Sequence, residues 1–382
     1  MRTVFISNYF NHHQKPLSDM LYLETGHQYS FIENEEMDSM RKNMGWKDDL
    51  RDNYVYSIDQ DGAKARIDDA EAIIIGSAPS KVVRYALRQN KLFFRYSERP
   101  LKKGFEPLKY FPRLLKWHFQ NPMSRLVYML CASAYAPKDY KKFGLFKNRC
   151  YKWGYFPETR NYDIGELFSE KQPTQILWVG RFLEWKHPYD AIEIAKRLKK
   201  CGTVFHMSFI GIGEMHDTMR DMIISNSLSD CVSLLDQMHP DEVRYNMEHS
   251  GIFLFTSDKR EGWGAVVNEA MNSGCAVVAS DAAGSVPYLV KNNENGFVYH
   301  SGDINELFTK VKFLIDNPKE QRRLGEAAYR TISNLWNAEV AAKRFVELAQ
   351  AIINGNKMPD LFDEGPCSRA DIIQEDWYKN AS

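Results

Sequence analysis

Short apolar runs alternate with longer segments of helical periodicity along most of this chain, and this alternation limits the fold more than any other feature. Strands that alternate with helices of about 10–15 residues form right-handed βαβ units, and such units build parallel sheets. The strands predicted in the second half of the chain are 175–179, 205–210, 231–235, 252–255 and 276–279. The helices predicted around them are 189–200, 214–226, 241–249, 305–316 and a pair within 319–353. The second half is therefore predicted to be an α/β domain with a parallel sheet.

The first half follows the same plan less regularly. Its predicted strands are 3–7, 72–76, 92–96 and 149–153, its predicted helices are 81–89 and 137–143, and an apolar run at 126–131 has no clear assignment. A length of 382 residues also favours two domains over one. We predict an α/β fold with two facing Rossmann-like domains, each with a parallel sheet, and an interdomain cleft.

The domain boundary is predicted from a polar segment without periodicity. Residues 157–175 contain two prolines and read as a linker. We place a first domain at 1–160, a second at 161–354 and a tail at 355–382. The tail ends in a segment, 369–379, whose apolar residues predict a short helix packed on the first domain.

Cysteine usage and hydropathy bear on the compartment. The six cysteines are scattered, without the spacing of a metal site or a disulfide framework, which is typical of reduced thiols in a cytoplasmic protein. No apolar run approaches the ~20 residues that a helix needs to cross a bilayer. The first apolar run reaches polar Asn8 too early for a signal peptide. We expect a cytoplasmic protein, with peripheral attachment to the inner face of the membrane as an extension of that expectation.

Charge is distributed unevenly, although the formal net charge is zero. Residues 81–160 hold 19 lysines and arginines against four acidic residues, and 101–122 mixes these cations with Phe, Tyr and Trp. That mixture suits an anionic membrane surface or a lipid-phosphate acceptor. The alternative is a solvated basic face without a partner. Nucleic acid uses the same features, but no nucleic-acid motif accompanies them, so we expect no nucleic-acid partner.

Two carboxylates bracket a glycine-containing helix start at 261–270. This segment follows the apolar run 251–255, and open α/β sheets bind ligands at the carboxyl ends of their strands. Free N–H groups at a helix start attract phosphate, whereas an ionised carboxylate accepts hydrogen bonds from the hydroxyls of a polyol. Phosphate and polyol together describe a nucleotide sugar. A continuous helix would separate Glu261 from Glu269 by ~12 Å, so Glu261 has to lie in the loop and Glu269 in the helix.

Two further loops follow predicted strands of the second half. Gly180-Arg181 and then Lys186 follow 175–179, and two cations there can hold a diphosphate and stabilise it as a leaving group. Taken alone, such cations are more often ordinary surface residues. Gly211 and Gly213 follow 205–210, but a dinucleotide fingerprint needs a third glycine at position 216, which is histidine. We exclude NAD and interpret the two glycines either as a close approach beside the ligand or as an ordinary strand–helix turn.

Residues 174–350 resemble the nucleotide-sugar domain of the retaining GT-B glycosyltransferases of family 4. The matching motifs, in order, are Val179-Gly180-Arg181 with Lys186, 209–213, Glu261-Gly262-Trp263-Gly264, Asn268-Glu269-Ala270, 274–281, Ala283-Gly284 and 295–298. The resemblance covers nearly half of the chain. It implies a GT-B fold and transfer of a sugar from a nucleoside diphosphate with retention of the anomeric configuration.

The resemblance also implies roles for individual residues. Arg181 and Lys186 would bind the diphosphate, Glu261 the donor sugar and Glu269 the ribose. The remaining donor-binding positions are Gly180, Gly211, Gly213, Gly262, Gly264, Ala265 and Val266, through their backbone. Neither a metal nor a cofactor is expected besides the nucleotide sugar, for which we favour a UDP-sugar. A glycan or lipid-linked acceptor, as in cell-envelope polysaccharide synthesis, is the expected partner. The alternatives are a non-catalytic subunit that binds nucleotide sugars and a GT-B epimerase or hydrolase.

Two positions depart from the family, and the first half gives weaker signals. The family often has paired glycines after its first strand, where this chain has 8–14 without glycine. Tyr288 stands after Pro287 where many members have Glu, and we assign it no role. His12 and His13 are candidates to position the acceptor hydroxyl or contact the donor phosphate; the alternative is a loop pair without a catalytic role. Glu98 and Arg99 follow 92–96 and are expected on the acceptor side.

Overall fold

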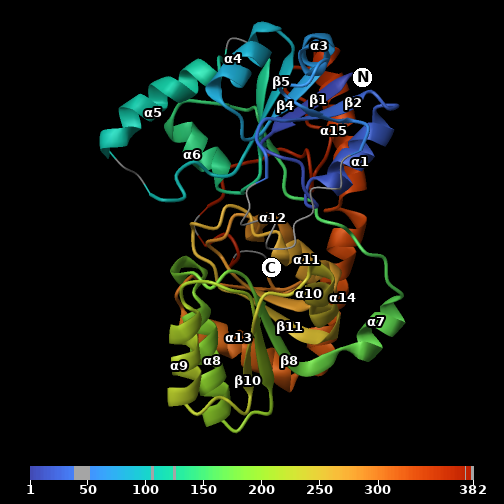
Figure 1. Ribbon diagram of the computed structural model, residues 1–382. Helices are drawn as coiled ribbons and strands as arrows, with labels where there is room; N and C mark the ends of the chain where they lie inside the picture. Colours follow the sequence, from blue (N-terminus) through green and yellow to red (C-terminus); the bar gives the residue numbers. More distant parts are fainter. Residues whose placement is uncertain (38–51, 105–106, 124–125, 375, 380–382) are drawn as a thin grey trace. The chain divides into compact units, whose positions relative to one another are not determined.

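The computed structural model describes residues 1–37, 52–104, 107–123, 126–374 and 376–379. The chain divides into two compact units (Figure 1). Unit 1 comprises Met1–Glu158 and Trp336–Ile373, and unit 2 comprises Thr159–Leu335 and Gln374–Ser382. Each unit is a parallel sheet covered by helices on both faces, so the prediction of two Rossmann-like α/β domains is confirmed.

The sheet of unit 1 contains seven parallel strands within the described residues, in the order β3-β2-β1-β4-β5-β6-β7. They are β1 (Thr3–Ser7), β2 (Tyr29–Glu33), β3 (Val55–Ser57), β4 (Ala72–Ile75), β5 (Leu92–Ser97), β6 (Val127–Cys131) and β7 (Cys150–Lys152). Most of these strands are apolar and buried, as expected of a sheet that is covered on both sides. The strand order reverses between β1 and β4, and the carboxyl ends of these two neighbours mark the point where open α/β sheets bind ligands.

Helices pack on both faces of this sheet. On one face lie α3 (Ala63–Asp69), α4 (Ser80–Arg88), α5 (Pro107–Gln120) and α6 (Ala136–Lys142), and on the other lie α1 (Lys15–Glu24) and α15 (Ala338–Ile353) (Figure 1). The core between the sheet and the first group includes Ile73, Phe93 and Met129 from the strands and Ala86 and Tyr140 from the helices.

The sheet of unit 2 contains six parallel strands within the described residues, in the order β10-β9-β8-β11-β12-β13. They are β8 (Gln172–Val179), β9 (His206–Ile210), β10 (Val232–Leu235), β11 (Ser250–Phe255), β12 (Ala276–Ser280) and β13 (Phe297–Tyr299). Here the order reverses between β8 and β11, so these two strands are neighbours although more than 70 residues of chain separate their starts, Gln172 and Ser250. The loops that follow β8 and β11 therefore emerge side by side.

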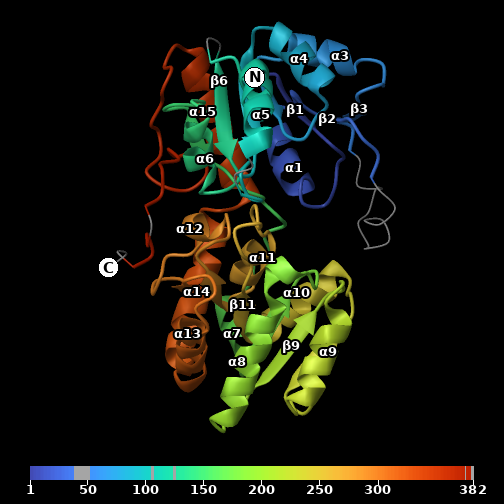
Figure 2. The same cartoon turned by 90° about the vertical axis from the view of Figure 1, so that its left-hand side faces the viewer.

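Helices again cover both faces. One face carries α8 (Pro188–Lys200), α9 (His216–Ser225) and α13 (Ile304–Asp316), and Figure 2 looks onto this face with α8 and α9 in front. The other carries α10 (Pro240–His249), α11 (Val266–Asn272) and α14 (Pro318–Asn334) (Figure 1). Short elements complete the unit: α7 (Ile164–Glu170), the 3₁₀ turn η1 (Glu184–Lys186) and α12 (Val286–Leu289).

The sequence of α8 shows why this segment forms a helix and which side it buries. Pro188 occupies the first turn, where its missing N–H costs nothing. Buried Ala191, Ala195 and Leu198 recur at helical spacing and pack on the sheet. Three basic residues in the last turn, among them Lys200, complement the negative end of the helix dipole.

The prediction that α15 belongs to the second domain is wrong. The chain returns to unit 1 at Trp336, and the Phe345 ring packs against Phe94 of β5 at a centroid distance of 5.1 Å and against Trp153 at 6.0 Å. Helix periodicity reveals that a face is apolar, but not which of two similar sheets it covers.

The predicted linker at 157–175 is also more ordered than expected. Asp163 caps α7, because its carboxylate accepts a hydrogen bond of 3.0 Å from the Glu166 N–H. Strand β8 then begins at Gln172, with polar residues in its first half. The absence of apolar periodicity therefore hid one helix and the start of one strand.

Residues 369–374 of the tail contain no helix, although a short helix was predicted over 369–379. Arg369 forms a bridge with Tyr151 of β7, Ser368 accepts a hydrogen bond of 2.8 Å from the Lys152 N–H, and Ala370 donates one of 3.0 Å to Cys150. Because β7 is the last strand of its sheet, its unpaired backbone groups draw the tail into a strand-like pairing. Residues through Ile373 belong to unit 1, and those from Gln374 belong to unit 2.

Two buried tyrosines fasten the tail further upstream. The Tyr128 hydroxyl donates to the Lys357 carbonyl at 2.8 Å, and the Tyr151 hydroxyl donates to the Pro359 carbonyl at 3.0 Å.

We predict that the double variant Tyr128→Phe/Tyr151→Phe lowers the free energy of unfolding by about 1–3 kcal/mol, measured in urea, since each lost hydrogen bond is worth about 1 kcal/mol. It should also speed proteolysis of 355–373. Tyr245→Phe, at an exposed position of unit 2, is the control. Equal protection of the tail in all three proteins would contradict this account.

Candidate active site

The loops that follow β8 and β11 meet in unit 2 because the strand order reverses between these strands. Lys186, at the end of η1, forms an ion pair with Glu261 from the β11 loop. Both side chains are largely buried, with 13% and 12% of their surface exposed. The same Glu261 oxygen, Oε2, accepts a hydrogen bond of 3.1 Å from the Ser257 hydroxyl. Among the described residues, Oε1 of Glu261 has no partner and remains available.

A second set of hydrogen bonds holds η1 against the β11 loop. The Trp178 indole N–H donates to the Thr256 hydroxyl at 2.9 Å, and that hydroxyl donates to the Lys186 carbonyl at 2.6 Å. The Asp258 N–H donates to the Trp185 carbonyl at 3.0 Å. The backbone that carries Lys186 is therefore fixed before any ligand binds, which is the preorganisation that electrostatic catalysis requires.

Arg181 lies at the carboxyl end of β8, one residue beyond Gly180, and its side chain is exposed. Within the described residues its guanidinium makes no hydrogen bond or ion pair. It thus differs from Lys186, whose charge is balanced by Glu261. An exposed arginine without a partner has all five N–H donors available to a ligand.

Gly211 and Gly213 are required by the packing of two loops within the protein. A Cβ atom on Gly211 would lie 2.0 Å from the Gly180 carbonyl oxygen, and one on Gly213 would lie 2.4 Å from the Phe182 carbonyl oxygen. The Phe182 N–H also donates to the Ile212 carbonyl at 2.8 Å. The β9 loop therefore presses on the β8 loop that carries Arg181, and the glycines permit this contact. Contact of these two glycines with a ligand stays a prediction.

The segment after Glu261 forms a tight turn into α11. Gly264 has a φ of 91°, and a Cβ there would lie 2.3 Å from the Phe255 ring. Buried Trp263 anchors the turn, because its indole N–H donates to the Asn268 side chain at 2.9 Å. The helix starts at Val266 with Ala265 as its N-cap, and no side chain caps it. At seven residues α11 has a weak dipole, so its contribution would come from its first N–H groups.

Glu269 lies in the first turn of α11, whereas Glu261 lies in the loop, which is the arrangement that a shared ligand requires. The Glu269 carboxylate forms no hydrogen bond or ion pair with a described residue. Burial raises its pKa above the usual value, an effect opposed by the nearby positive charges of Arg244 and Arg160. Glu269 is half-buried, and a partly desolvated carboxylate without a hydrogen-bond partner costs stability. Such groups gather at functional sites.

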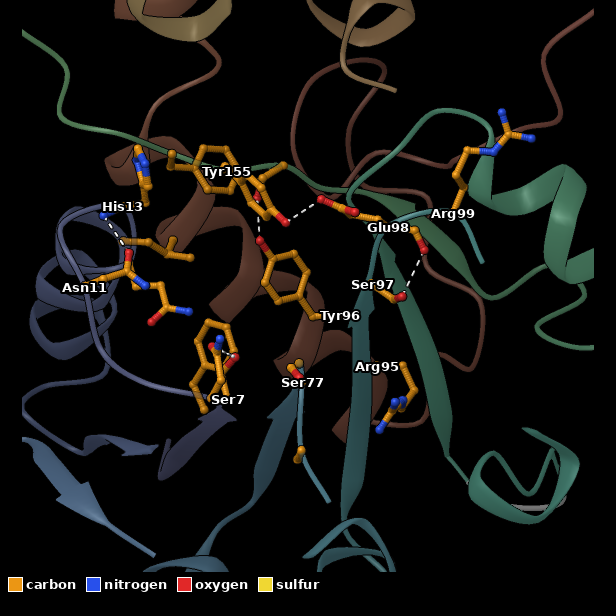
Figure 3. A pocket seen from close by; sticks show the side chains of 18 of the residues that line it. Ser7, Asn11, His13, Ser77, Arg95, Tyr96, Ser97, Glu98, Arg99 and Tyr155 are labelled. Carbon is orange, nitrogen blue, oxygen red and sulfur yellow. Dashed lines mark hydrogen bonds between the residues drawn. The ribbon is translucent and has the colours of Figure 1, made fainter. Parts of the chain in front are cut away.

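Unit 1 has a pocket of about 670 Å³ at the carboxyl ends of its central strands (Figure 3). It is lined by residues that follow or end four strands: Ser7 and Asn8 at β1, Gly76 and Ser77 after β4, Ser97 and Glu98 at β5, and Gly154 and Tyr155 after β7. The pocket thus surrounds the β1–β4 reversal point of the sheet. His13 lines it, as do Glu98 and Arg99, so three of the four candidates of the first half meet here.

His12 and His13 lie together, with ring centroids 4.0 Å apart. Burial lowers the pKa of His12 to about 4, and burial together with the neighbouring His12 lowers the pKa of His13 to about 3. Both imidazoles are therefore neutral at pH 7. A neutral imidazole can accept a hydrogen bond from a hydroxyl, but neither ring supplies positive charge to bind a phosphate.

Glu98 and Arg99 are held by partners within unit 1. Glu98 accepts a hydrogen bond of 2.7 Å from the Tyr155 hydroxyl and forms an ion pair of 2.6 Å with Lys102 (Figure 3). Arg99 donates two hydrogen bonds to buried Asp139, at 3.1 and 3.2 Å. Arg99 is thereby tied to α6, and its charge is neutralised.

Arg95 lines the same pocket and was not predicted as a site residue from the sequence. The signal was present, since Arg95 is a charged residue within the otherwise apolar run 92–96. The run was assigned as a strand from its apolar residues, and no role was given to Arg95, its one charged residue.

The described part of the chain offers neither a metal site nor a helix that spans a membrane. It contains no group of three or more His, Cys, Asp or Glu side chains that could hold a metal ion. None of its helices is both long and apolar enough to cross a bilayer. A second cavity, of about 230 Å³, lies in unit 2 beside Lys171, Gly251 and Gly274, at the amino ends of the strands and away from Lys186 and Glu261.

The two histidines make stability depend on pH. A folded-state pKa below the unfolded value of 6.5 gives stability that is present above pH 6.5 and lost as pH falls toward about 3. We predict that His13→Asn removes part of this loss, so the difference in unfolding free energy between wild type and variant shrinks by at least ~1 kcal/mol between pH 7 and pH 4. Urea unfolding at each pH measures it. His27→Asn, at an exposed site, is the control, and parallel pH profiles of wild type and His13→Asn would contradict the prediction.

Part of the chain resembles proteins that are already known. Residues 160–331 match the family glycosyl transferases group 1. The chain is 27% identical over 206 residues to the amylovoran biosynthesis glycosyltransferase AmsK of Erwinia amylovora, covering 53% of this chain and 50% of that protein. It is 26% identical over 186 residues to the putative colanic acid biosynthesis glycosyltransferase WcaL of Escherichia coli, covering 47% and 46%. The chain thus spans about half the length of these curated relatives.

Solved structures extend the likeness to both units. HepE of Anabaena in complex with UDP has a TM-score of 0.67 at 13% identity, over 92% of this chain and all of that one (100%). The lipopolysaccharide outer core galactosyltransferase WaaB has a TM-score of 0.65 at 15% identity, over 93% and 99%. At these identities the likeness shows the fold, which is the predicted GT-B class. Residues 160–331, less than half of the chain, thus match the glycosyl transferases group 1 family.

Proposed function

We propose that this protein is a glycosyltransferase that moves a sugar from a nucleoside-diphosphate donor, bound by unit 2, to a glycan or lipid-linked acceptor. The single observation that carries the proposal is the ion pair between Lys186 and Glu261 at the β8–β11 reversal point, with Arg181 on the same loop as Lys186. Two cations and a carboxylate with one free oxygen match a diphosphate joined to a sugar.

Arg181 and Lys186 bind the diphosphate in this proposal. A nucleoside diphosphate carries negative charge that grows when the sugar leaves, and fixed cations stabilise that charge most where water is scarce. Arg181 is available for direct binding because no described residue neutralises it. Lys186 is held in place by Glu261 and by the fixed backbone of η1. Because these cations supply the positive charge, we propose that the reaction needs no metal.

The two carboxylates bind hydroxyls. Oε1 of Glu261 can accept a hydrogen bond from a donor-sugar hydroxyl while Oε2 keeps Lys186 and Ser257. Glu269 binds the ribose in this proposal. Its carboxylate lacks a hydrogen-bond partner and burial raises its pKa, and the ribose hydroxyls can donate hydrogen bonds to it without adding charge. The backbone N–H groups of 264–266 complete the donor contacts.

A UDP-sugar and retention of configuration remain the favoured details. HepE is a structural neighbour whose complexes contain UDP and UDP-glucose. In the retaining reaction the bond between the anomeric carbon and the diphosphate oxygen breaks, and the acceptor oxygen bonds to the same face of that carbon. The acceptor proton passes to an oxygen of the leaving diphosphate. AmsK and WcaL are named for amylovoran and colanic acid biosynthesis, which supports a polysaccharide acceptor, and the pocket of unit 1 is proposed to hold it.

Helix α5 is proposed to attach the protein to an anionic membrane. Phe111, Leu115 and Phe119 recur at four-residue spacing on one side of the helix and are 64%, 57% and 67% exposed. The other side packs into unit 1, where Trp117 contacts Phe143 at a ring distance of 4.3 Å. Exposed Lys116 adds positive charge beside the apolar stripe. An amphipathic helix of this composition binds at the surface of a bilayer.

We predict that Arg181→Ala lowers kcat/KM for sugar transfer by about 10²-fold, since it removes a cation that stabilises the leaving diphosphate. Its stability should change by less than about 0.5 kcal/mol, because the side chain is exposed and has no partner. Lys186→Ala should lower kcat/KM similarly but also destabilise unit 2 by about 1–3 kcal/mol, since Glu261 loses its counter-charge.

The assay uses UDP-, GDP- and ADP-sugars with a lipid-linked acceptor extract, in buffer with and without EDTA. Lys200→Ala, an exposed lysine of α8 in the same unit, is the matched control. Wild-type turnover in folded Arg181→Ala would show that the donor site is wrongly assigned. Free sugar as the sole product would identify a hydrolase. Loss of sugar transfer in the buffer with EDTA would refute the metal-independent mechanism.

The membrane prediction is tested by sedimentation with vesicles. Wild-type protein should bind vesicles that contain phosphatidylglycerol at least about fivefold more strongly than the double variant Phe111→Ser/Phe119→Ser, because each lost aromatic side chain removes apolar burial in the bilayer. Ile224→Ser removes a similarly exposed apolar residue, 61% exposed, from unit 2 and is the control. Equal sedimentation of the double variant and wild type would exclude α5 as the anchor.

A further inference from the structure

Arg95 is the charged residue of unit 1 whose environment the proposed reaction does not yet explain. It lies on β5 and lines the 670 Å³ pocket (Figure 3). The Nη1 atom of its guanidinium is buried and forms no hydrogen bond. Within the described residues, Arg95 also forms no ion pair. Arg95 is thus a half-buried cation in a cavity wall, with its Nη1 atom fully buried and no anion beside it among the described residues.

The other charges in the wall of this pocket are balanced. Arg99 is paired with Asp139, and Lys102 is paired with Glu98. His13 is neutral, as its lowered pKa shows. Among the residues that line the pocket, Arg95 is therefore the cation without a compensating carboxylate.

Desolvation of Arg95 costs free energy of folding, and no hydrogen bond or ion pair from the described residues offsets it. A buried charge without a partner is among the least favourable arrangements in a protein. Burial lowers the pKa of Arg95. An arginine side chain nevertheless keeps its proton in proteins, so it does not escape this cost by becoming neutral. A structural arginine would show hydrogen bonds to carbonyls or carboxylates that repay its burial. Arg95 shows none, whereas Arg99, four residues away, has two to Asp139.

The rest of the wall is suited to a sugar. The residues that line the cavity include five with hydroxyl groups: Ser7, Ser77, Tyr96, Ser97 and Tyr155. Tyr96 and Arg95 are consecutive in β5 and point to opposite sides of that strand (Figure 3). Serine and tyrosine hydroxyls both donate and accept hydrogen bonds, as sugar hydroxyls do. The volume lies within the range of small-molecule sites. The wall thus joins hydroxyl groups to a single unbalanced guanidinium.

We propose that the pocket of unit 1 binds a sugar that bears an oxyanion, a phosphate or a carboxylate, and that Arg95 binds this oxyanion through its guanidinium fork. The inference rests on the proposed function, since it specifies the chemical class of the acceptor. Arginine forms two parallel hydrogen bonds with either oxyanion. The charged group on the acceptor then selects it against neutral sugars of the same size.

The test is a calorimetric titration of the full-length protein with glucose 6-phosphate, glucuronate and glucose. Saturating UDP is present throughout, so that the cations of unit 2 are occupied. Wild type should bind one of the two anionic sugars at least about tenfold more tightly than glucose, and the preferred one identifies the oxyanion. Arg95→Met should reduce that preference to less than about threefold, and Arg95→Lys, which keeps the charge but loses the fork, should lie between them. Arg88→Met, at an exposed position of α4, should match wild type.

Thermal unfolding separates binding from structure. Replacing an unbalanced buried cation by methionine should leave the melting temperature unchanged or raise it, whereas loss of a structural arginine would lower it. The proposal is overturned if wild type binds neither anionic sugar better than glucose, or if Arg95→Met keeps the preference or melts at a lower temperature than wild type. If Arg95→Met does not fold, Arg95→Lys decides by the same preference. Failure of UDP to bind would count against the donor site in unit 2 alone; the sugar titrations without UDP would still read the Arg95 preference.

Discussion

The ion pair between Lys186 and Glu261 joins two loops that the sequence separates by 75 residues, and the rest of the proposed site depends on this connection. It exists because β8 and β11 are neighbours at the point where the strand order of unit 2 reverses. Thr256 adds the second connection by bonding the Lys186 carbonyl. Both charged side chains are largely buried, so their positions are well defined. If one were removed, the other would remain desolvated without a counter-charge, which is strongly destabilising. The pair leaves one carboxylate oxygen for a ligand and holds the lysine in place, and both consequences serve the recognition of a diphosphate sugar.

The same sheet geometry occurs twice, with different chemistry at each reversal point. In unit 2 the charge of Lys186 is balanced by Glu261, whereas Arg181 has no ion-pair partner among the described residues. In unit 1 the pocket is lined by hydroxyls and neutral histidine, with Arg95 as its unbalanced charge. Glu269, Arg181 and Arg95 share one property: no residue in the described part of the chain forms an ion pair with any of them. Natural folds leave such groups unsatisfied chiefly where a ligand completes them.

Much of unit 2 was predictable from the sequence, because its strands are continuous apolar runs and its helices have clear periodicity. The placement of Glu261 in a loop and Glu269 in a helix followed from the two glycines between them. Other features required three dimensions. The sequence does not reveal that Gly211 accommodates the Gly180 carbonyl, that α15 covers the sheet of unit 1, or that 367–370 pair with β7, since each depends on a neighbour distant in the chain. Arg95 was missed for the opposite reason: its strand was assigned correctly, and the exceptional charge within it was not questioned.

The most direct test of the central claim compares how Glu261→Gln affects the binding of UDP-glucose and of UDP to the full-length protein. In this account Glu261 contacts the sugar and restrains Lys186, which contacts the diphosphate. The substitution should therefore weaken UDP-glucose binding by about tenfold, the loss expected for a hydrogen bond to a charged group. Binding of UDP should stay unchanged or become tighter, because the released lysine is free to pair with phosphate. Equal weakening of both ligands, or no effect on either, would contradict the assignment of this pair to a nucleotide-sugar site.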